Sequence, residues 1–291
     1  VLNRVLRHVV QPRIRATETP QEAAADFSRF ARRVLQRPPH LMRVVSAGKP
    51  DIHWITAGPV AERGVILHFH GGAYIAGSPR THAGMLGRLS MLAGIRVAAP
   101  AYRLAPRHPA PAQFEDALDA HARLMALGYR PCKIVLGGDS AGGGIALALL
   151  SELCRIGQTP AGLYAFSPWV DMTLSGESLR SNTARDPFLP ASRIEDARAF
   201  VLGGLAATDP RVSPELAEFD APPPVCLHVG TTEILRDDAR RMAIHLRSCG
   251  GEVGLREWPE APHVWPMFDG YLPEAREALE DVAHFIAGLD V

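Results

Sequence analysis

The alternation of apolar and polar residues along the chain predicts an α/β protein. Short apolar, partly β-branched runs alternate with longer segments in which apolar residues recur at helical spacing. Strands that alternate with helices usually align in parallel, so this order predicts a parallel sheet with helices on both faces. The strand-like runs are residues 64–69, 95–99, 134–136, 163–166, 225–229 and 252–258, and the helical segments are residues 80–93, 112–127, the stretch after residue 144, 235–248 and 274–287.

The chain before residue 60 predicts a different arrangement. Thr19, Pro20 and Glu22 match an N-cap, a first-turn proline and a capping-box glutamate. Apolar residues then repeat at helical spacing, so a helix should run from about residue 20 to 36. Two strand-like pieces, residues 41–46 and 52–56, flank the turn SAGKPD and predict an antiparallel hairpin at the edge of the sheet.

The alternation of strands and helices is interrupted at residues 171–220. This segment is polar and rich in proline, and it contains one expected helix at residues 192–202. Open α/β sheets bind their ligands at the carboxyl ends of the strands. An insertion of this size directly after a strand therefore predicts a lid over that edge of the sheet.

The composition allows a large core and indicates no charged partner. The chain has 291 residues and 47% hydrophobic content, enough for one large core or two modest ones. Because 31 basic side chains balance 31 acidic ones, no net field favours nucleic acid or an anionic membrane. No apolar run approaches the ~20 residues of a membrane span, and basic residues interrupt any signal-like stretch, so we expect a cytoplasmic location. The four cysteines form no CxxC motif, and we expect them to be reduced core residues: Cys132, Cys154, Cys226 and Cys249.

The stretch KIVLGGDSAGGGIALA carries the first candidate for chemistry. Gly138, Ser140 and Gly142 fit GxSxG spacing between a strand and a helix. Small neighbours there allow a cramped turn that exposes the serine hydroxyl. A glycine-rich loop could instead bind phosphate, but the stretch has neither a GxxxxGK[ST] nor a GxGxxG motif. Ser140 is therefore a candidate nucleophile.

A serine nucleophile requires a base, and His263 is the candidate with the most suitable position. It lies in the loop EAPHVWP between a strand and the last helix, whereas His245 and His284 fall within predicted helices. The acid-rich segment TTEILRDD precedes it. The order serine, acid, histidine is that of the α/β hydrolases.

The stretch HFHGGAYIAGS directly follows a predicted strand. Glycines leave backbone N–H groups unobstructed, and acyl transfer needs such donors at the developing oxyanion. We predict these donors to be Gly71, Gly72 and Ala73, with the amide of Ala141 after the serine. A metal site at His68 and His70 is disfavoured, because alternate strand residues face opposite sides of the sheet and no third ligand is suitably spaced. For His70 we expect a structural hydrogen-bonding role.

Five motifs together resemble a known family. HGGA, YRLAPRHPAPA, GDSAGG, EILRDD and APHVW occur in order within residues 60–290. They look like the motifs of the hormone-sensitive-lipase-like branch of the α/β hydrolases, bacterial carboxylesterases with an HGGG oxyanion motif. The resemblance implies a helical cap, no cofactor and a preference for short acyl esters. The cap would comprise residues 1–40 and the insertion 171–220, on a catalytic α/β-hydrolase domain of residues 41–291.

The resemblance implies Ser140 as nucleophile and His263 as base, with two departures from the family pattern. Ala73 stands where glycine is usual, and it still donates an amide N–H but restricts φ. Glu233 stands where the family usually has its catalytic aspartate, and Asp237 matches the second acid of that segment. Glu233 follows a strand and a short turn at the carboxyl edge, whereas Asp237 comes about one helical turn later. We therefore predict Glu233 as the triad acid, with Asp237 as the open alternative.

The sequence predicts a serine carboxylesterase that hydrolyses short- to medium-chain esters through an acyl-enzyme. We predict substrate contacts from Tyr74, Asp139, Phe188 and Leu189. The expected partner is a small-molecule ester, without nucleic acid or stable membrane association, and a homodimer stays an open alternative. Two other classes also stay open. A small-molecule receptor can share this fold, and a lipase could act on long chains, although no exposed apolar lid helix is evident.

Overall fold

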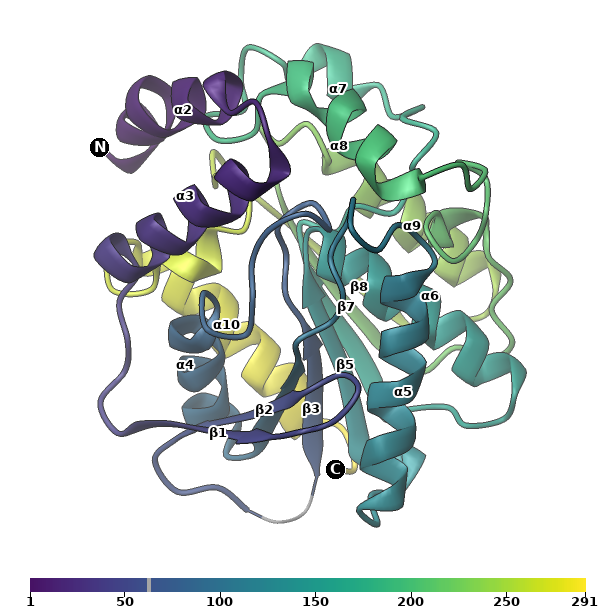
Figure 1. Ribbon diagram of the computed structural model, residues 1–291. Coiled ribbons are helices and arrows are strands. Elements are labelled where there is room, and N and C mark those ends of the chain that lie inside the picture. The colour runs from purple at the N-terminus through teal and green to yellow at the C-terminus, as the bar shows by residue number, and fades with distance from the viewer. Residues whose placement is uncertain (62–63) are drawn as a thin grey trace.

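A computed structural model describes residues 1–61 and 64–291 of the chain (Figure 1). The strands are β1 (Leu41–Ser46), β2 (Ile52–Ala57), β3 (Val65–Phe69), β4 (Arg96–Pro100), β5 (Ile134–Asp139), β6 (Gly162–Phe166), β7 (Val225–Gly230) and β8 (Val253–Trp258). The described residues form one eight-stranded sheet with the order β1-β2-β4-β3-β5-β6-β7-β8. Strand β2 is antiparallel to β1 and β4, and β3 to β8 pair in parallel. The predicted fold class and edge hairpin are confirmed.

Helices cover both faces of this sheet and one end of the molecule. They are α1 (Leu2–Val5), α2 (Gln11–Ala16), α3 (Pro20–Val34), α4 (Ala83–Ala93), α5 (Ala112–Ala126), α6 (Ala141–Arg155), α7 (Ser178–Ser181), α8 (Ile194–Leu202), α9 (Arg236–Ser248) and α10 (Pro273–Ala287). Helices α4 and α10 pack on one face, and α5, α6 and α9 pack on the other, to the left and right in Figure 1. The expected elements all form, with ends shifted by a few residues. Within the described ranges, no helix is long and apolar enough to cross a membrane.

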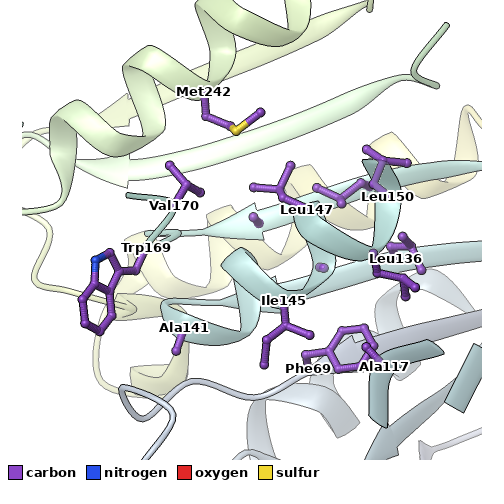
Figure 2. Close-up of a cluster of buried hydrophobic side chains, with 14 of the residues drawn as sticks. Phe69, Ala117, Leu136, Ala141, Ile145, Leu147, Leu150, Trp169, Val170 and Met242 are labelled. Carbon is purple, nitrogen blue, oxygen red and sulfur yellow. The ribbon is translucent and has the colours of Figure 1, made fainter. Parts of the chain in front are cut away.

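The core consists of two apolar layers separated by the sheet. Successive strand residues face opposite sides, so Leu136 of β5 packs under α6 whereas Val135 packs under α4 and α10. Figure 2 shows Leu136 in the first layer with Phe69 of β3 and Ile145 of α6. Helix α6 is buried along most of its length. Its first residue, directly after Ser140, is therefore held firmly against the sheet.

Residues 1–40 and 171–220 lie together at one end of the molecule, where Figure 1 shows α2 and α3 beside α7 and α8. Two arginines join the segments through backbone carbonyls: Arg7 Nη2 donates to Arg185 O at 2.8 Å, and Arg193 Nη2 donates to Thr17 O at 2.7 Å. Both segments line the cavity that contains Ser140. Both predicted cap segments thus contribute to the wall of the cavity that contains the candidate nucleophile, and their assignment as a cap stays a prediction.

Two features differ from the sequence-based expectations. The polar segment after residue 171 contains α7, which has too few apolar residues to show a helical period. Cys132 is exposed instead of buried, because it lies in a short 3₁₀ turn, Pro131–Lys133, that precedes β5 on the surface. Cys154 is buried, and the other two cysteines are half-buried.

Candidate active site

Ser140 occupies a strained turn between β5 and α6. Its backbone has φ 53° and ψ −123°, a combination that costs a non-glycine residue about 1–3 kcal/mol. The neighbouring glycines make the turn sterically feasible. A Cβ on Gly138 would lie 2.2 Å from Gly142 O, and a Cβ on Gly142 would lie 2.0 Å from Phe69 O. The GxSxG spacing therefore reflects close backbone contacts that no larger residue permits.

Three polar side chains from separate loops form one hydrogen-bonded row. His263 Nε2 lies 2.9 Å from Ser140 Oγ, and His263 Nδ1 lies 2.6 Å from Glu233 Oε2. All three residues are buried, with Glu233 fully shielded from solvent. The second carboxylate oxygen, Oε1, accepts from Gly230 N at 2.6 Å and from Ser167 Oγ at 2.7 Å. Two donors therefore fix Oε1, and Oε2 is left for the imidazole.

Ser167 is a site residue that the sequence analysis missed. It directly follows β6, and it adopts a positive φ of 49°. Its hydroxyl donates to Glu233 and accepts from Val264 N at 3.2 Å, so it joins the loop of the acid to the loop of the histidine. The one available signal was a serine followed by proline at the carboxyl end of a predicted strand.

Asp237, the alternative triad acid, faces a different part of the molecule. It lies in the first turn of α9, accepts from Ser178 N at 2.8 Å, and pairs with Arg236 at 3.0 Å. Burial alone would raise the pKa of Asp237, but the bond from Ser178 and the charge of Arg236 hold it below its ordinary value. The structure thus places Glu233, and not Asp237, against the imidazole of His263.

The loop after β3 carries the predicted oxyanion donors, and one of them needs correction. The N–H of Gly71 donates to Asp139 Oδ2 at 3.0 Å, so it is already engaged. Gly72 and Ala73 line the same cavity as Ser140. In the described part of the chain, no acceptor engages the N–H of Gly72, Ala73 or Ala141. These three amides are the donors available to a ligand.

Asp139 was predicted to contact substrate, but protein donors occupy both of its carboxylate oxygens. His68 Nε2 lies 3.1 Å from Oδ1, while His82 Nε2 (3.2 Å) and Gly71 N (3.0 Å) lie on Oδ2. Burial alone would raise the pKa of Asp139, yet the attraction of His82 and the hydrogen bond from His68 hold it well below its ordinary value. Asp139 therefore borders the cavity as an ionised anchor for the oxyanion loop.

His70 has the structural role expected of it. Its Nδ1 lies 2.8 Å from Gly71 O, and its ring stacks on Tyr102 with centroids 4.2 Å apart. The hydroxyl of Tyr102 donates to His70 O at 2.6 Å. Burial lowers the pKa of His70 to about 3, so the ring is neutral and Nδ1–H is the donor to Gly71.

The other predicted substrate contacts separate into two groups. Tyr74 is only 2% exposed, packs edge-on against Trp169, and lies outside the cavity lining, so its predicted contact with substrate is not supported by its position. Phe188 and Leu189 do line the cavity. The ring of Phe188 also stacks on His263, with centroids 6.2 Å apart and an interplanar angle of 22°.

A cavity of about 1050 Å³ contains Ser140 and His263 in its wall. Pockets of this size are at the upper end of those that enclose drug-sized ligands. Bulky apolar side chains from both cap segments enclose it: Phe27, Phe30, Phe188, Leu189 and Phe200. The wall is mostly apolar, so it suits an apolar ligand with one polar group at Ser140.

A profile of the α/β hydrolase fold family matches residues 66–267. The chain belongs to this family. An acetyl-hydrolase from Streptomyces hygroscopicus is 36% identical over 282 residues, covering 95% of this chain and 89% of the relative. Among solved structures, an esterase from the bacterial hormone-sensitive lipase family has a TM-score of 0.89 and 36% identity, and the match covers 93% of this chain and 91% of that chain. The structure of EstE5, soaked by p-nitrophenyl butyrate, has a TM-score of 0.90 and 32% identity, and the match covers 98% of this chain and 96% of that chain.

These relatives confirm the resemblance to the hormone-sensitive-lipase-like branch of the α/β hydrolases. The protein is a carboxylic ester hydrolase of that branch. Its two departures from the family pattern now have a structural description. Ala73 adopts φ 53°, the left-handed region that usually favours glycine. Glu233 reaches the histidine directly.

The oxyanion loop of this esterase generates the first prediction. Gly72 has φ 122°, and a Cβ there would lie 2.3 Å from Ala76 O. Gly72→Ala should therefore displace the loop and lower kcat by about 10²-fold or more, the loss typical of one missing oxyanion donor. Ala73→Gly is the matched control, because glycine adopts the same φ without strain, and it should keep a near wild-type kcat. Hydrolysis of p-nitrophenyl butyrate and thermal melts measure both variants. A Gly72→Ala enzyme with wild-type kcat would show that the loop does not bind the oxyanion.

Proposed function

We propose that this esterase hydrolyses short- to medium-chain carboxylic esters through an acyl-enzyme formed on Ser140. The observation that carries the proposal is the row of hydrogen bonds from Ser140 through His263 to Glu233 in the wall of the cavity. A serine hydroxyl is a weak nucleophile until a base accepts its proton. The distance of 2.9 Å from Ser140 Oγ to His263 Nε2 is within the range for that transfer.

The chemistry follows from the positions of these atoms. As Ser140 Oγ attacks the ester carbonyl, His263 Nε2 takes its proton, and Glu233 stabilises the resulting imidazolium. The oxyanion accepts hydrogen bonds from the free amides of Gly72, Ala73 and Ala141. The tetrahedral intermediate then collapses, and His263 returns the proton to the departing alcohol. Water activated by the same imidazole attacks the acyl-enzyme and releases the acid.

The proposed preference for short acyl groups is supported by two bulky side chains near His263 and by the relatives. The ring of Phe188 lies against His263, and Leu189 beside it also lines the cavity. Bulky side chains this close to the imidazole limit the space for an extended acyl chain. The soaking of EstE5 with p-nitrophenyl butyrate supports a butyrate ester as the first substrate to test.

Labelling of Ser140 tests the mechanism. An organophosphate should modify the protein stoichiometrically at Ser140, and Ser140→Ala should lose about 10⁴- to 10⁶-fold in kcat while it still binds substrate. Mass spectrometry of the labelled peptide and steady-state kinetics measure the two effects. Modification at another residue, or a Ser140→Ala enzyme of near-normal rate, would refute the serine mechanism.

A comparison of two amide variants tests the triad acid. Glu233→Gln should lower kcat by roughly 10³- to 10⁴-fold at neutral pH, because the amide favours the wrong histidine tautomer. Asp237→Asn is the matched control and should keep most of the rate, since its oxygen can still accept from Ser178 N. Steady-state kinetics measure kcat of both variants, and thermal melts establish that each variant is folded. If Asp237→Asn loses most of its kcat and Glu233→Gln keeps it, Asp237 and not Glu233 is the triad acid.

A series of p-nitrophenyl esters tests the chain-length preference. Each methylene adds about 0.8 kcal/mol of binding until the pocket is full, after which extension no longer helps. Esters of C2 to C6 acids should therefore be hydrolysed with a higher kcat/KM than esters of C12 or longer acids. A rate that rises steadily to C16 and increases sharply above the micellar threshold would indicate a lipase instead.

Two further proposals rest on sequence alone. We infer a cytoplasmic location from the four scattered cysteines, which form no CxxC motif, and cell fractionation tests it. We also infer that the functional partner is a small-molecule ester, not nucleic acid or a membrane. Size-exclusion chromatography decides between a monomer and a homodimer.

A further inference from the structure

Three buried polar side chains of the cap insertion contact the loop that carries Glu233. They are Ser178, Asn182 and Asp186, spaced four residues apart, and each is at most 1% exposed. The first belongs to α7, the short helix at the top of Figure 1. We call these three residues the clasp, and residues 230–237 the acid loop.

Ser178 and Asn182 bond to backbone groups of the acid loop. Ser178 Oγ donates to Ile234 O at 2.7 Å and accepts from Asp237 N at 3.0 Å. Asn182 Nδ2 donates to Glu233 O at 2.8 Å and to Thr231 O at 3.2 Å. The clasp thus contacts the main chain before, at and after Glu233.

Asp186 completes the clasp and joins it to the cavity wall. Its Oδ2 accepts from Ile234 N at 3.0 Å. Its Oδ1 accepts from Phe188 N at 2.8 Å and Leu189 N at 2.9 Å. One buried carboxylate therefore fixes the residue after Glu233 and the two cavity residues beside His263.

The N-terminal segment is connected to the same point. Gln11 of α2 is buried, and its Nε2 donates to Asp186 O at 3.1 Å and to Leu189 O at 3.3 Å. Both cap segments therefore reach the acid loop through Asp186. Movement of either segment would be transmitted to the backbone beside Glu233.

The buried carboxylate of Asp186 is electrostatically unfavourable, and packing alone does not require a charged side chain at this position. Burial and the nearby charge of Glu233 raise the pKa of Asp186 to about 6, although the N–H donors and His263 oppose this. A charged group so placed destabilises the fold unless its donors hold it. Glu233 on the acid loop and His263 after β8 are the titratable groups that face it, and α2 contributes the neutral Gln11.

We propose that Ser178, Asn182 and Asp186 are positioning residues for ester hydrolysis. They hold the acid loop so that Glu233 Oε2 meets His263 Nδ1, and they make the cap insertion part of the framework of the triad. The inference rests on the proposed function, because it requires Glu233 to orient His263 during catalysis.

The test compares two clasp variants with a matched control in wild-type background. In Asp186→Asn, the side-chain NH₂ group must face either Ile234 N or the backbone N–H groups of Phe188 and Leu189, and it cannot accept a hydrogen bond from them. Asn182→Ala removes the two hydrogen bonds from Asn182 Nδ2 to the acid loop. The control is Asp116→Asn on α5, a buried carboxylate that accepts from Arg103 N at 2.6 Å and Arg103 Nε at 2.9 Å. All three should lower the melting temperature. Only the clasp variants should also lower kcat, by about 10²-fold with little change in KM, as expected for a misplaced catalytic group.

The pH profile separates the two clasp variants. Asp186→Asn removes a carboxylate with a pKa of about 6 that interacts electrostatically with Glu233 and His263. The acid limb of its kcat/KM profile should move to lower pH. Asn182→Ala changes no charge, and its acid limb should stay where the wild-type limb lies.

The outcomes distinguish this inference from the proposed function. If an organophosphate labels Ser140 in the wild type but both clasp variants keep wild-type kcat, the inference is wrong and the proposed function stands. An equal loss of kcat in Asp116→Asn would also contradict the inference, because it would show that the clasp residues affect kcat only through the stability of the fold. If the organophosphate does not label Ser140, both the inference and the proposed function are wrong. Should Asp186→Asn fail to fold, kcat of Asn182→Ala decides.

Discussion

The site depends on the buried carboxylate of Asp139 more than on any other single group. This residue ends β5 directly before Ser140, and its Oδ2 accepts from the N–H of Gly71 in the oxyanion loop. His68 and His82 supply its other donors. A buried carboxylate without such donors would be strongly destabilising, so the strand and the loop must be held together. One ionised side chain therefore joins the strand that leads to Ser140 to the loop that carries the proposed oxyanion donors.

The same principle recurs at Glu233 and Asp186. Each is a buried carboxylate whose oxygens are engaged by donors from different segments. Networks of this kind stabilise a structure only when every member is satisfied. The strand ends, the oxyanion loop, the acid loop and the cap insertion consequently support one another through these carboxylates. This explains how an active site built mainly from loops can keep its geometry.

The sequence predicts the sheet and the elbow well because both follow from local rules. Apolar periodicity determines which faces are buried, and the glycines around Ser140 mark a close backbone contact. The sequence cannot show which donor a buried carboxylate selects. It therefore favours Glu233 without excluding Asp237, gives no role to Ser167, and assigns the Gly71 amide to substrate when Asp139 engages it. These contacts join segments far apart in the chain, and no spacing rule records them.

The substitution of glutamate for the usual aspartate links these observations. Glutamate has an additional rotatable bond, so holding its carboxylate in one position costs more conformational entropy. Gly230 and Ser167 fix one oxygen of Glu233, and the clasp fixes the backbone on both sides of it. A longer acid can orient His263 as accurately as a shorter one only if its surroundings supply the missing rigidity. In this esterase the cap insertion contacts the acid loop and lines the cavity, and the role that we propose for it is to supply part of this rigidity.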